Sequence, residues 1–198
     1  MEEKIQSSDI KIERLEKEDS HYIKNFSCGN EQLDAFFIKD VIKCIDSHYV
    51  VAYCAKLKDN NNIVAIFTLA NDAIILTNNS DSDDFKEENY NLFSEEYQAI
   101  FKEQSSYPAI NIAHLAVENQ YQDKGIGSHI IDYLIDTFLE YKIAGCQLIT
   151  VDSLNNPQTN RFYLKKRLFK FYKFRFTKSN KTNVPAFRGI QKFIMTNV

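Results

Sequence analysis

The chain has 198 residues, of which 44% are hydrophobic and 13% aromatic, and its net charge is −3. This length suits one well-buried domain and is short for two. Its apolar runs are too short to span a bilayer and its charged start is unlike a signal peptide, so we expect a cytoplasmic protein without a membrane partner.

Charge is divided unevenly along the chain. Residues 153–198 contain 11 basic residues and no acidic residue, a balance of +11. Residues 1–152 contain the other 13 basic residues and all 27 acidic residues, a balance of −14. Segregation on this scale exceeds what a solvated surface usually shows, and it indicates a polyanionic partner for the C-terminal part.

The four cysteines lie far apart, without a C-x-x-C pair and without a histidine at metal-ligand spacing. They are Cys28, Cys44, Cys54 and Cys146. This pattern predicts buried free thiols, with no metal site and no disulfide. Cys28 could be a nucleophile, but no basic neighbour lowers its pKa, which favours a packed thiol.

The first predicted helix follows a short strand. Residues 10–15 alternate between apolar and charged side chains and predict a strand. Asn30 is a candidate N-cap, and Glu31 and Asp34 suit the positive end of the helix that it opens. Apolar residues then recur at helical spacing to about Ile45, which gives the helix a face for the core.

Two strands and an acidic segment come next. Residues 49–57 and 63–76 are rich in β-forming residues, and the polar residues 58–62 between them predict a hairpin. Residues 77–107 are polar and acidic, and we expect a loop followed by a helix around residues 95–102. We interpret this segment as an excursion within the domain.

The stretch from Ile110 to Tyr141 contains a predicted strand, a break and a strongly amphipathic helix. The break has the pattern Q-x-x-G-x-G at residues 122–127. Its glycines let the backbone turn sharply and approach a ligand. The helix then presents N–H groups at its positive end, so the stretch predicts a backbone cradle for a phosphate or pyrophosphate. Neither a P-loop G-K-[ST] nor the Rossmann spacing is present.

The last third predicts further strands. Residues 148–152 read as a short buried strand, Pro157 suits a first helical turn, and residues 189–195 predict a final strand. No repeat or linker interrupts the chain, so we expect one domain over residues 1–198. The order of elements predicts an α/β or α+β fold with a mixed sheet.

These motifs resemble a known family. Leu115-Ala-Val, the Q-x-x-G-x-G loop, Asn156 and Phe162-Tyr163 together resemble the GNAT superfamily of acetyl-CoA-dependent N-acetyltransferases, over most of the chain. The element F-x-C-G-x-x-x-L-D-x-F-F at residues 26–37 resembles the branch that contains bacterial toxins acetylating aminoacyl-tRNA. The resemblance implies a mostly antiparallel sheet of about seven strands, flanked by helices, with a splayed central strand pair.

The resemblance also implies which residues bind acetyl-CoA, and it implies no metal. The backbone of Leu115, Ala116 and Val117 would bind the pantetheine arm, and Asn156 would face the pantetheine or the thiol. The pyrophosphate would be held by the loop and the first helical turn. Those residues are Gln122, Asp123, Lys124, Gly125, Ile126, Gly127 and Ser128.

Tyr163 would stand near the CoA sulfur and donate a proton to it. A phenol with a pKa of about 10 is protonated at neutral pH, so it can serve as an acid without tuning. A bend of the central strand at residues 115–117 would free a backbone N–H for the oxyanion of the tetrahedral intermediate. Without the resemblance, a packed tyrosine would be the preferred interpretation of Tyr163.

His114 and Glu118 share one face of the predicted central strand and are the candidates for a general base. A histidine among apolar neighbours is more often structural, and Glu118 is equally well explained as a solvated strand end. An α-amine has a pKa of about 7.7–8.0, against about 10.4 for lysine, and needs little help to lose its proton. A weakly equipped site therefore favours an α-amine acceptor.

The basic C-terminal third fits aminoacyl-tRNA as the acceptor, since its cations would contact phosphates and its aromatic rings would stack on bases. The alternative is a helix that exposes cations, followed by a strand with aromatic core residues. The family usually has Y-x-K-x-G-F after the catalytic tyrosine, whereas this chain has Tyr163-Leu-Lys-Lys-Arg-Leu-Phe. A toxin of this branch would also have an antitoxin partner and form a homodimer.

Two other functions remain open from the sequence. The acidic residues 77–107 would suit a cationic acceptor, such as a protein amine or a small polyamine. The irregular turn after Tyr163 would suit a GNAT-like module that binds CoA or RNA without catalysis.

Overall fold

The computed structural model describes residues 4–75, 86–87, 95–140, 145–146, 148–154, 159, 161–163, 169–175 and 190–196. Its strands form a sheet in the order β1-β2-β3-β4-β5-β7-β6. The chain divides into two compact units. Unit 1 contains Met1–Ala70 and Ile112–Tyr141, and unit 2 contains Asn71–Asn111 and Lys142–Val198.

Unit 1 begins with an antiparallel arrangement of strands. β1 (Ile10–Arg14) pairs with β2 (Val51–Leu57), and β2 pairs with β3 (Ile63–Ile75). The polar residues 58–62 connect β2 to β3, as their composition predicted. The β2–β3 register shifts between Ala55 and Lys56.

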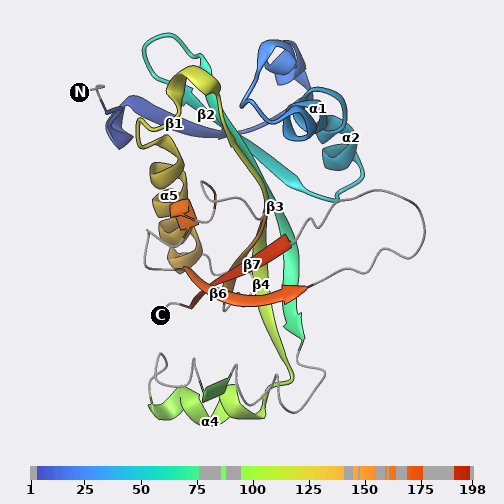
Figure 1. The fold of residues 1–198 in the computed structure, drawn as a ribbon, viewed down its shortest axis with the longest axis vertical. Coiled ribbons are helices and arrows are strands. Elements are labelled where there is room, and N and C mark those ends of the chain that lie inside the picture. Colours follow the sequence, from blue (N-terminus) through green and yellow to red (C-terminus); the bar gives the residue numbers. More distant parts are fainter. Residues whose placement is uncertain are drawn as a thin grey trace. The chain divides into compact units, whose positions relative to one another are not determined.

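Helices cover both faces of this part of the sheet (Figure 1). α1 (Glu31–Lys39) and α2 (Val41–Asp46) lie on one face, and α5 (Ile126–Glu140) lies on the other. The sequence predicted one helix continuing to about Ile45, which is wrong. Asp40 separates α1 from α2 because its φ of −119° departs from helical geometry.

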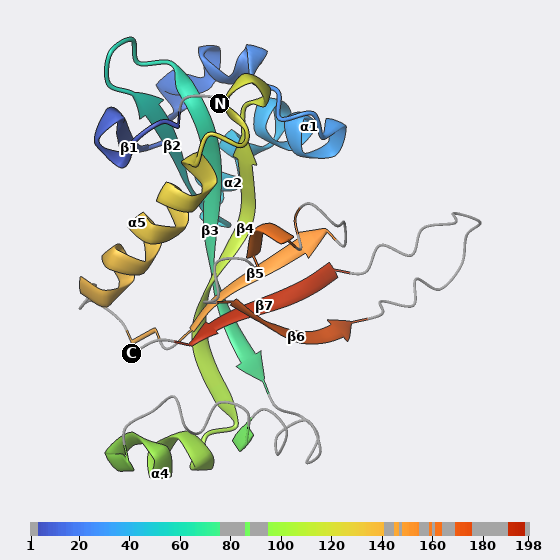
Figure 2. The ribbon, with the colours of Figure 1, turned by 60° about the vertical axis from the view of Figure 1, so that its left-hand side comes forward.

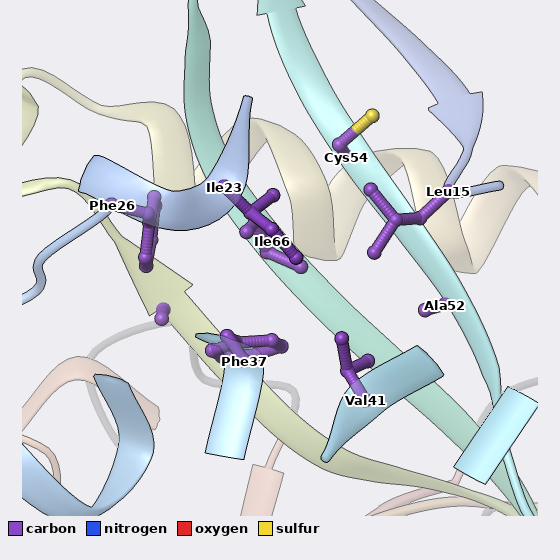
Figure 3. Close-up of a cluster of buried hydrophobic side chains, with 9 residues drawn as sticks. Leu15, Ile23, Phe26, Phe37, Val41, Ala52, Cys54 and Ile66 are labelled. Atoms are coloured by element: carbon purple, nitrogen blue, oxygen red, sulfur yellow. The ribbon is translucent and has the colours of Figure 1, made fainter. Parts of the chain in front are cut away.

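The main core of unit 1 lies between the strands and the two N-terminal helices (Figure 3). Phe37 and Val41 from the helices pack toward Ile66 and Ala52 of the strands, and none of the four is more than 1% exposed. The complete cluster is Leu15, Ile23, Phe26, Phe37, Val41, Ala52, Cys54, Ile66 and Ala116. Each large apolar side chain buried in this way contributes about 1.5–3 kcal/mol. The core therefore fixes α1 against the sheet.

The apolar stripe predicted for the central helix is buried in α5. Ile126, Ile130, Ile131 and Leu134 are each no more than 1% exposed. Their spacing of three, four and five residues places them on one side of the helix. This packing fixes the direction of α5 and hence the position of its N-terminus.

Unit 2 contains α4 (Glu95–Glu103) and the C-terminal strands (Figure 2). β5 (Leu148–Leu154) pairs antiparallel with β7 (Ile190–Thr196), which pairs antiparallel with β6 (Phe169–Arg175). A second core cluster consists of Ile74, Phe101, Tyr107, Ala109 and Leu148.

The long strand β4 (Ser106–Val117) contributes residues to both units. Burial along it alternates through Tyr107, Ala109 and Asn111, and then Ile112 is buried as well. Two adjacent buried residues depart from the two-residue burial period of a strand that has one exposed face. The bend expected at residues 115–117 stays a prediction.

The predicted α/β fold, with about seven mostly antiparallel strands flanked by helices, is confirmed. The splay of a central strand pair and the single-domain organisation stay predictions. All four cysteines are free thiols as predicted, although only Cys54 is fully buried. Pro157 and most of the acidic loop before residue 95 lie outside the described residues. Within the described part of the chain, no helix is long and apolar enough to cross a membrane.

Candidate active site

The predicted phosphate cradle lies in unit 1, between the end of β4 and the start of α5. Asp123 has a φ of +60° and Gly125 a φ of +94°. Aspartate tolerates the first conformation, whereas the second is one that glycine adopts without strain. His129 N–H donates to the Gly125 carbonyl over 3.1 Å as the helix begins. An α-helix leaves the amides of its first turn without intrahelical acceptors, and a helix that begins at such a loop suits an anion.

The N-terminal segment is hydrogen-bonded to this loop. Ile5 N–H donates to the Lys124 carbonyl over 3.1 Å, and His129 Nε2 donates to the Ile5 carbonyl over 2.9 Å. The Lys124 ammonium lies 5.6 Å from the centroid of the Tyr121 ring. The sequence did not single out Ile5 or His129, because their contacts join positions 124 residues apart.

Gln122 opens the Q-x-x-G-x-G loop, and its side chain is bound within the protein. Its Nε2 donates to the carbonyl oxygens of Cys28 (2.8 Å) and Val117 (3.0 Å) and to Oδ1 of Asn119 (3.2 Å). The predicted contact of Gln122 with a pyrophosphate stays a prediction. These bonds tie the loop to the end of β4 and to the turn before α1.

Asn30 caps α1 as the sequence predicted. Its Oδ1 accepts hydrogen bonds from the N–H groups of Gln32 and Leu33, both over 3.1 Å. Such a cap satisfies amides that the first helical turn leaves without acceptors. The cap fixes where the helix begins and therefore where the preceding turn meets the loop.

Asp34, in the first turns of α1, folds back onto that turn. Its carboxylate accepts Cys28 N–H over 2.7 Å and the Ser27 hydroxyl over 2.8 Å. Burial acts to raise the pKa of Asp34, but hydrogen bonds from Cys28, Ser27 and Gly29 outweigh it and hold the pKa below its usual range. Asp34 is therefore an ionised acceptor at neutral pH.

Cys28 does not have the properties of a nucleophile. Burial, followed by the nearby Asp34 carboxylate, raises the pKa of its thiol to about 11. The reactive form of cysteine is the thiolate, which is scarce at neutral pH for such a thiol. This supports the prediction of a packed thiol.

His114 lies on β4 with its imidazole against α1. Its Nδ1 is 2.8 Å from Oγ1 of Thr68, and the ring of Phe36 stacks on it with centroids 3.8 Å apart and an interplanar angle of 16°. Burial lowers the pKa of His114, so the imidazole is neutral at neutral pH. A neutral imidazole can accept a proton, and the same packing also suits a structural histidine. Its role as a base stays a prediction.

Glu118 does not continue the strand, because β4 ends at Val117. It is the N-cap of the short 3-10 helix η4 (Asn119–Tyr121), and its Oε2 accepts Gln120 N–H over 3.1 Å. Its own N–H donates to the Val64 carbonyl over 2.9 Å. The carboxylate thus has a capping function, and its role as a base stays a prediction.

The backbone predicted to bind pantetheine is the last part of β4. Ala116 is 3% exposed, whereas Leu115 and Val117 are partly exposed. The Val117 carbonyl accepts one of the Gln122 hydrogen bonds, as described above. His114, these three residues and the loop after Gln122 all belong to unit 1.

Tyr163 belongs to unit 2, and Asn156 lies outside the described residues. Tyr163 is 4% exposed, and its ring centroid lies 4.9 Å from that of Phe162 in an edge-to-face arrangement. Burial raises the pKa of Tyr163 above its ordinary value, so the phenol keeps its proton at neutral pH. This protonation state suits a proton donor.

Unit 2 also contains a polar network that the sequence did not indicate. The Thr150 hydroxyl donates to Oδ2 of Asp72 over 2.6 Å, and Asn111 Nδ2 donates to Thr150 Oγ1 over 3.1 Å. Asn111 and Thr150 are both buried. Their hydrogen bonds offset the cost of burying polar groups between strands.

A family model described as an acetyltransferase (GNAT) domain matches residues 91–166. The match includes β4, the loop, α5, β5 and Tyr163. No curated protein matches the sequence.

Several solved structures resemble the whole chain. A tyrosine-to-phenylalanine mutant of KacT gives a TM-score of 0.65 at 17% identity, covering 95% of both chains. AtaT complexed with acetyl-methionyl-tRNAfMet also gives 0.65, at 15% identity and 95% coverage of both chains. AtaTR bound with AcCoA gives 0.60 at 16% identity, covering 96% of this chain and 94% of the other. At these identities the likeness shows a shared fold.

Proposed function

We propose that this chain transfers the acetyl group of acetyl-CoA to the α-amine of aminoacyl-tRNA. Residues 91–166 match an acetyltransferase (GNAT) family model, and the fold resembles that of KacT, which together support the proposal. The observation that supports acetyl-CoA as the donor is the loop before α5, where Gly125 has a φ of +94° at the start of the helix. This loop lies inside the segment that matches the family model.

The donor would bind along β4 and the loop. Backbone amides of residues 123–128 would hold the pyrophosphate, and the Lys124 ammonium would add a positive charge beside it. The backbone of Leu115 and Val117 would bind the pantetheine arm, and Asn156 would face its thiol end. The partly exposed state of Leu115 and Val117 supports their access to a ligand.

The transfer requires a neutral amine and a protonated leaving group. The amine nitrogen attacks the thioester carbonyl carbon, the carbon–sulfur bond breaks, and Tyr163 gives its proton to the departing sulfur. The attacking nitrogen loses one proton, which restores the phenol through solvent or passes to neutral His114. The raised pKa of Tyr163 supports the first role, and the lowered pKa of His114 supports the second.

Aminoacyl-tRNA is proposed as the acceptor from the charge of the C-terminal residues and from the structural similarity to AtaT. Residues 153–198 carry 11 basic residues and no acidic one, which suits the phosphates of an RNA. AtaT has been solved with acetyl-methionyl-tRNAfMet, and also with the C-terminus of its antitoxin AtaR. By the same likeness we propose a cytoplasmic toxin with an antitoxin partner and a homodimeric state.

The test is acetyl transfer to defined RNA pools. The protein is incubated with radiolabelled acetyl-CoA and either aminoacylated or deacylated tRNA, with all amino acids represented. We expect label on the aminoacylated pool alone, and release of that label when the aminoacyl ester is hydrolysed at mild alkaline pH. An unlabelled aminoacylated pool would exclude tRNA as the acceptor.

A parallel screen separates the other functions. Turnover on peptides or polyamines without turnover on RNA would favour a cationic acceptor, for which the acidic residues 77–107 are the motivating feature. A ligand that binds the native state raises the melting temperature by mass action. An unchanged melting temperature with acetyl-CoA would therefore count against every acetyl-CoA-dependent function.

A further inference from the structure

Two sequence motifs that lie about 90 residues apart meet in unit 1. The first is the F-x-C-G-x-x-x-L-D element, and the second is the segment from Asn119 to the Q-x-x-G-x-G loop. Asn119 N–H donates to the Ser27 carbonyl over 2.9 Å, and Gln122 Nε2 donates to the Cys28 carbonyl over 2.8 Å. The turn before α1 is therefore hydrogen-bonded directly to the start of the predicted donor loop.

Side chains extend this contact into a chain of hydrogen bonds. The Ser27 hydroxyl donates to Asp34 over 2.8 Å, and Asn119 Nδ2 donates to Ser27 Oγ over 3.4 Å. Asn119 Oδ1 then accepts from Gln122 Nε2 over 3.2 Å. We call this sequence of contacts, from Asp34 through Ser27 and Asn119 to Gln122, the Asp34 relay.

The carboxylate of Asp34 sets the direction of the whole relay. An ionised carboxylate accepts hydrogen bonds and donates none, so Ser27 must give it its only hydroxyl proton. Ser27 can then only accept from Asn119, which turns the Asn119 amide so that Nδ2 faces Ser27. The oxygen of that amide is left to accept from Gln122. The ionised Asp34 carboxylate therefore fixes which atom donates and which atom accepts at each hydrogen bond of the relay.

Glycine at position 29 lets the two segments approach closely. Gly29 has a φ of +79°, and a Cβ built there would lie 2.9 Å from Asn119 Oδ1. That separation is shorter than carbon and oxygen tolerate without movement. A larger residue would push Asn119 away from the turn. The glycine of the F-x-C-G motif is thus explained by the relay.

We propose that Asp34 is a positioning residue for the acetyl-CoA loop, acting through Ser27 and Asn119 on Gln122. Gln122 directly precedes Asp123, where the backbone turns to a φ of +60° to form the cradle. Its Nε2 carries two hydrogens for three acceptors, so its orientation depends on which acceptors the relay presents. The inference rests on the proposed function for the identity of the ligand.

Asparagine at position 34 is the most direct test. Asp34→Asn keeps the shape but adds an N–H₂ donor, so the direction of the relay is no longer fixed. We expect the Kd of acetyl-CoA, measured by titration calorimetry, to rise roughly fivefold or more, in keeping with the loss of a charge-assisted hydrogen bond. The KM for the acceptor should not change, because the relay acts on the donor loop. This selectivity distinguishes positioning from a general loss of folded protein, which would lower the amount of active enzyme without raising the Kd of acetyl-CoA alone.

Two controls separate positioning from damage. Asp40→Asn makes the same chemical change at an exposed ion pair with Lys43, whose atoms lie 2.9 Å apart, and should leave acetyl-CoA affinity unchanged. Ser27→Ala should weaken acetyl-CoA binding as Asp34→Asn does. Ser27→Thr keeps the hydroxyl and should bind acetyl-CoA with wild-type affinity. The Ser27 pair tests the relay even if Asp34→Asn does not fold.

A double-mutant cycle provides the decisive result. If Asp34 acts through Gln122, the Asp34→Asn, Gln122→Ala double variant should bind acetyl-CoA no more weakly than Gln122→Ala alone. Additive losses, or wild-type affinity in Asp34→Asn and Ser27→Ala, would overturn the proposal. If the wild-type protein binds no acetyl-CoA, the proposed function fails. The relay then remains testable, because Asp34→Asn should still speed amide exchange at Asn119 and Gln122, and unchanged exchange would overturn it.

Discussion

The two units hold their predicted functional residues by different means. In unit 1, the loop is shaped by backbone conformation and by hydrogen bonds from several segments, including Ile5 and the turn before α1. In unit 2, Tyr163 is a buried phenol whose predicted chemistry depends on its own hydroxyl. The comparison implies that backbone changes in the unit 1 loop should alter the affinity for acetyl-CoA. Removal of the Tyr163 hydroxyl oxygen in unit 2 should instead alter turnover.

Removing the hydroxyl of Tyr163 should have the largest effect on catalysis. We expect Tyr163→Phe to lower kcat by at least about tenfold, because a general acid contributes on that scale or more. The Kd of acetyl-CoA should stay within about twofold of wild type, since the loop lies in the other unit. Steady-state kinetics and calorimetry on the same preparation provide both values. Unchanged turnover would remove Tyr163 as the acid and break the comparison.

Replacing Gly125 by alanine should lower the affinity for acetyl-CoA without affecting the acceptor. A Cβ there has room, since its nearest neighbour would be His129 Nε2 at 3.6 Å, but the φ of +94° is strained for alanine. Strain of about 1–3 kcal/mol should distort the cradle, and we expect Gly125→Ala to weaken acetyl-CoA binding about tenfold. Gly145→Ala, at a position with no atom within 4 Å of the added carbon, is the matched control. Equal affinity in both variants would contradict a backbone-built site.

The partly buried imidazole of His114 should produce a smaller, pH-dependent effect on stability. Its folded-state pKa is lowered by burial, so below a pH of about 6.5 the unfolded chain binds a proton more readily than the folded protein. The stability attributable to His114 is therefore present at neutral pH and is lost as the pH falls from about 6.5 through the folded-state pKa. Urea unfolding at pH 7.5 and pH 5 should show a smaller difference for His114→Gln than for wild type. An equal difference in both proteins would show that other groups are responsible.

Local patterns were sufficient to predict much of the fold. The cap at Asn30, the buried stripe of α5 and the hairpin after β2 each depend on residues within a few positions of one another. The break at Asp40 was missed because the apolar spacing continues across it. Glu118 was assigned to a strand because its parity matches His114, but the backbone had already turned into η4.

Contacts between distant segments could not be read in the same way. The hydrogen bonds of Asn119 and Gln122 with the turn before α1 join positions 92 and 94 residues apart. No periodicity links such positions, and Ser27 or Asn119 alone is an ordinary polar residue. The sequence indicated Asp34 by its charge near a helix N-terminus and as part of the F-x-C-G-x-x-x-L-D-x-F-F element, but it did not indicate its partners, which are Ser27 and Cys28.

The sequence by itself determined the fold class and the place of the glycine loop before α5. Both follow from local physics, since apolar periodicity marks the strands and helices and a glycine lets the backbone turn where the helix begins. Only the tertiary structure decided that His114 is neutral, and only it decided the direction of the Asp34 relay. Burial and hydrogen-bond partners set these properties, and both arise when segments distant in the sequence pack together.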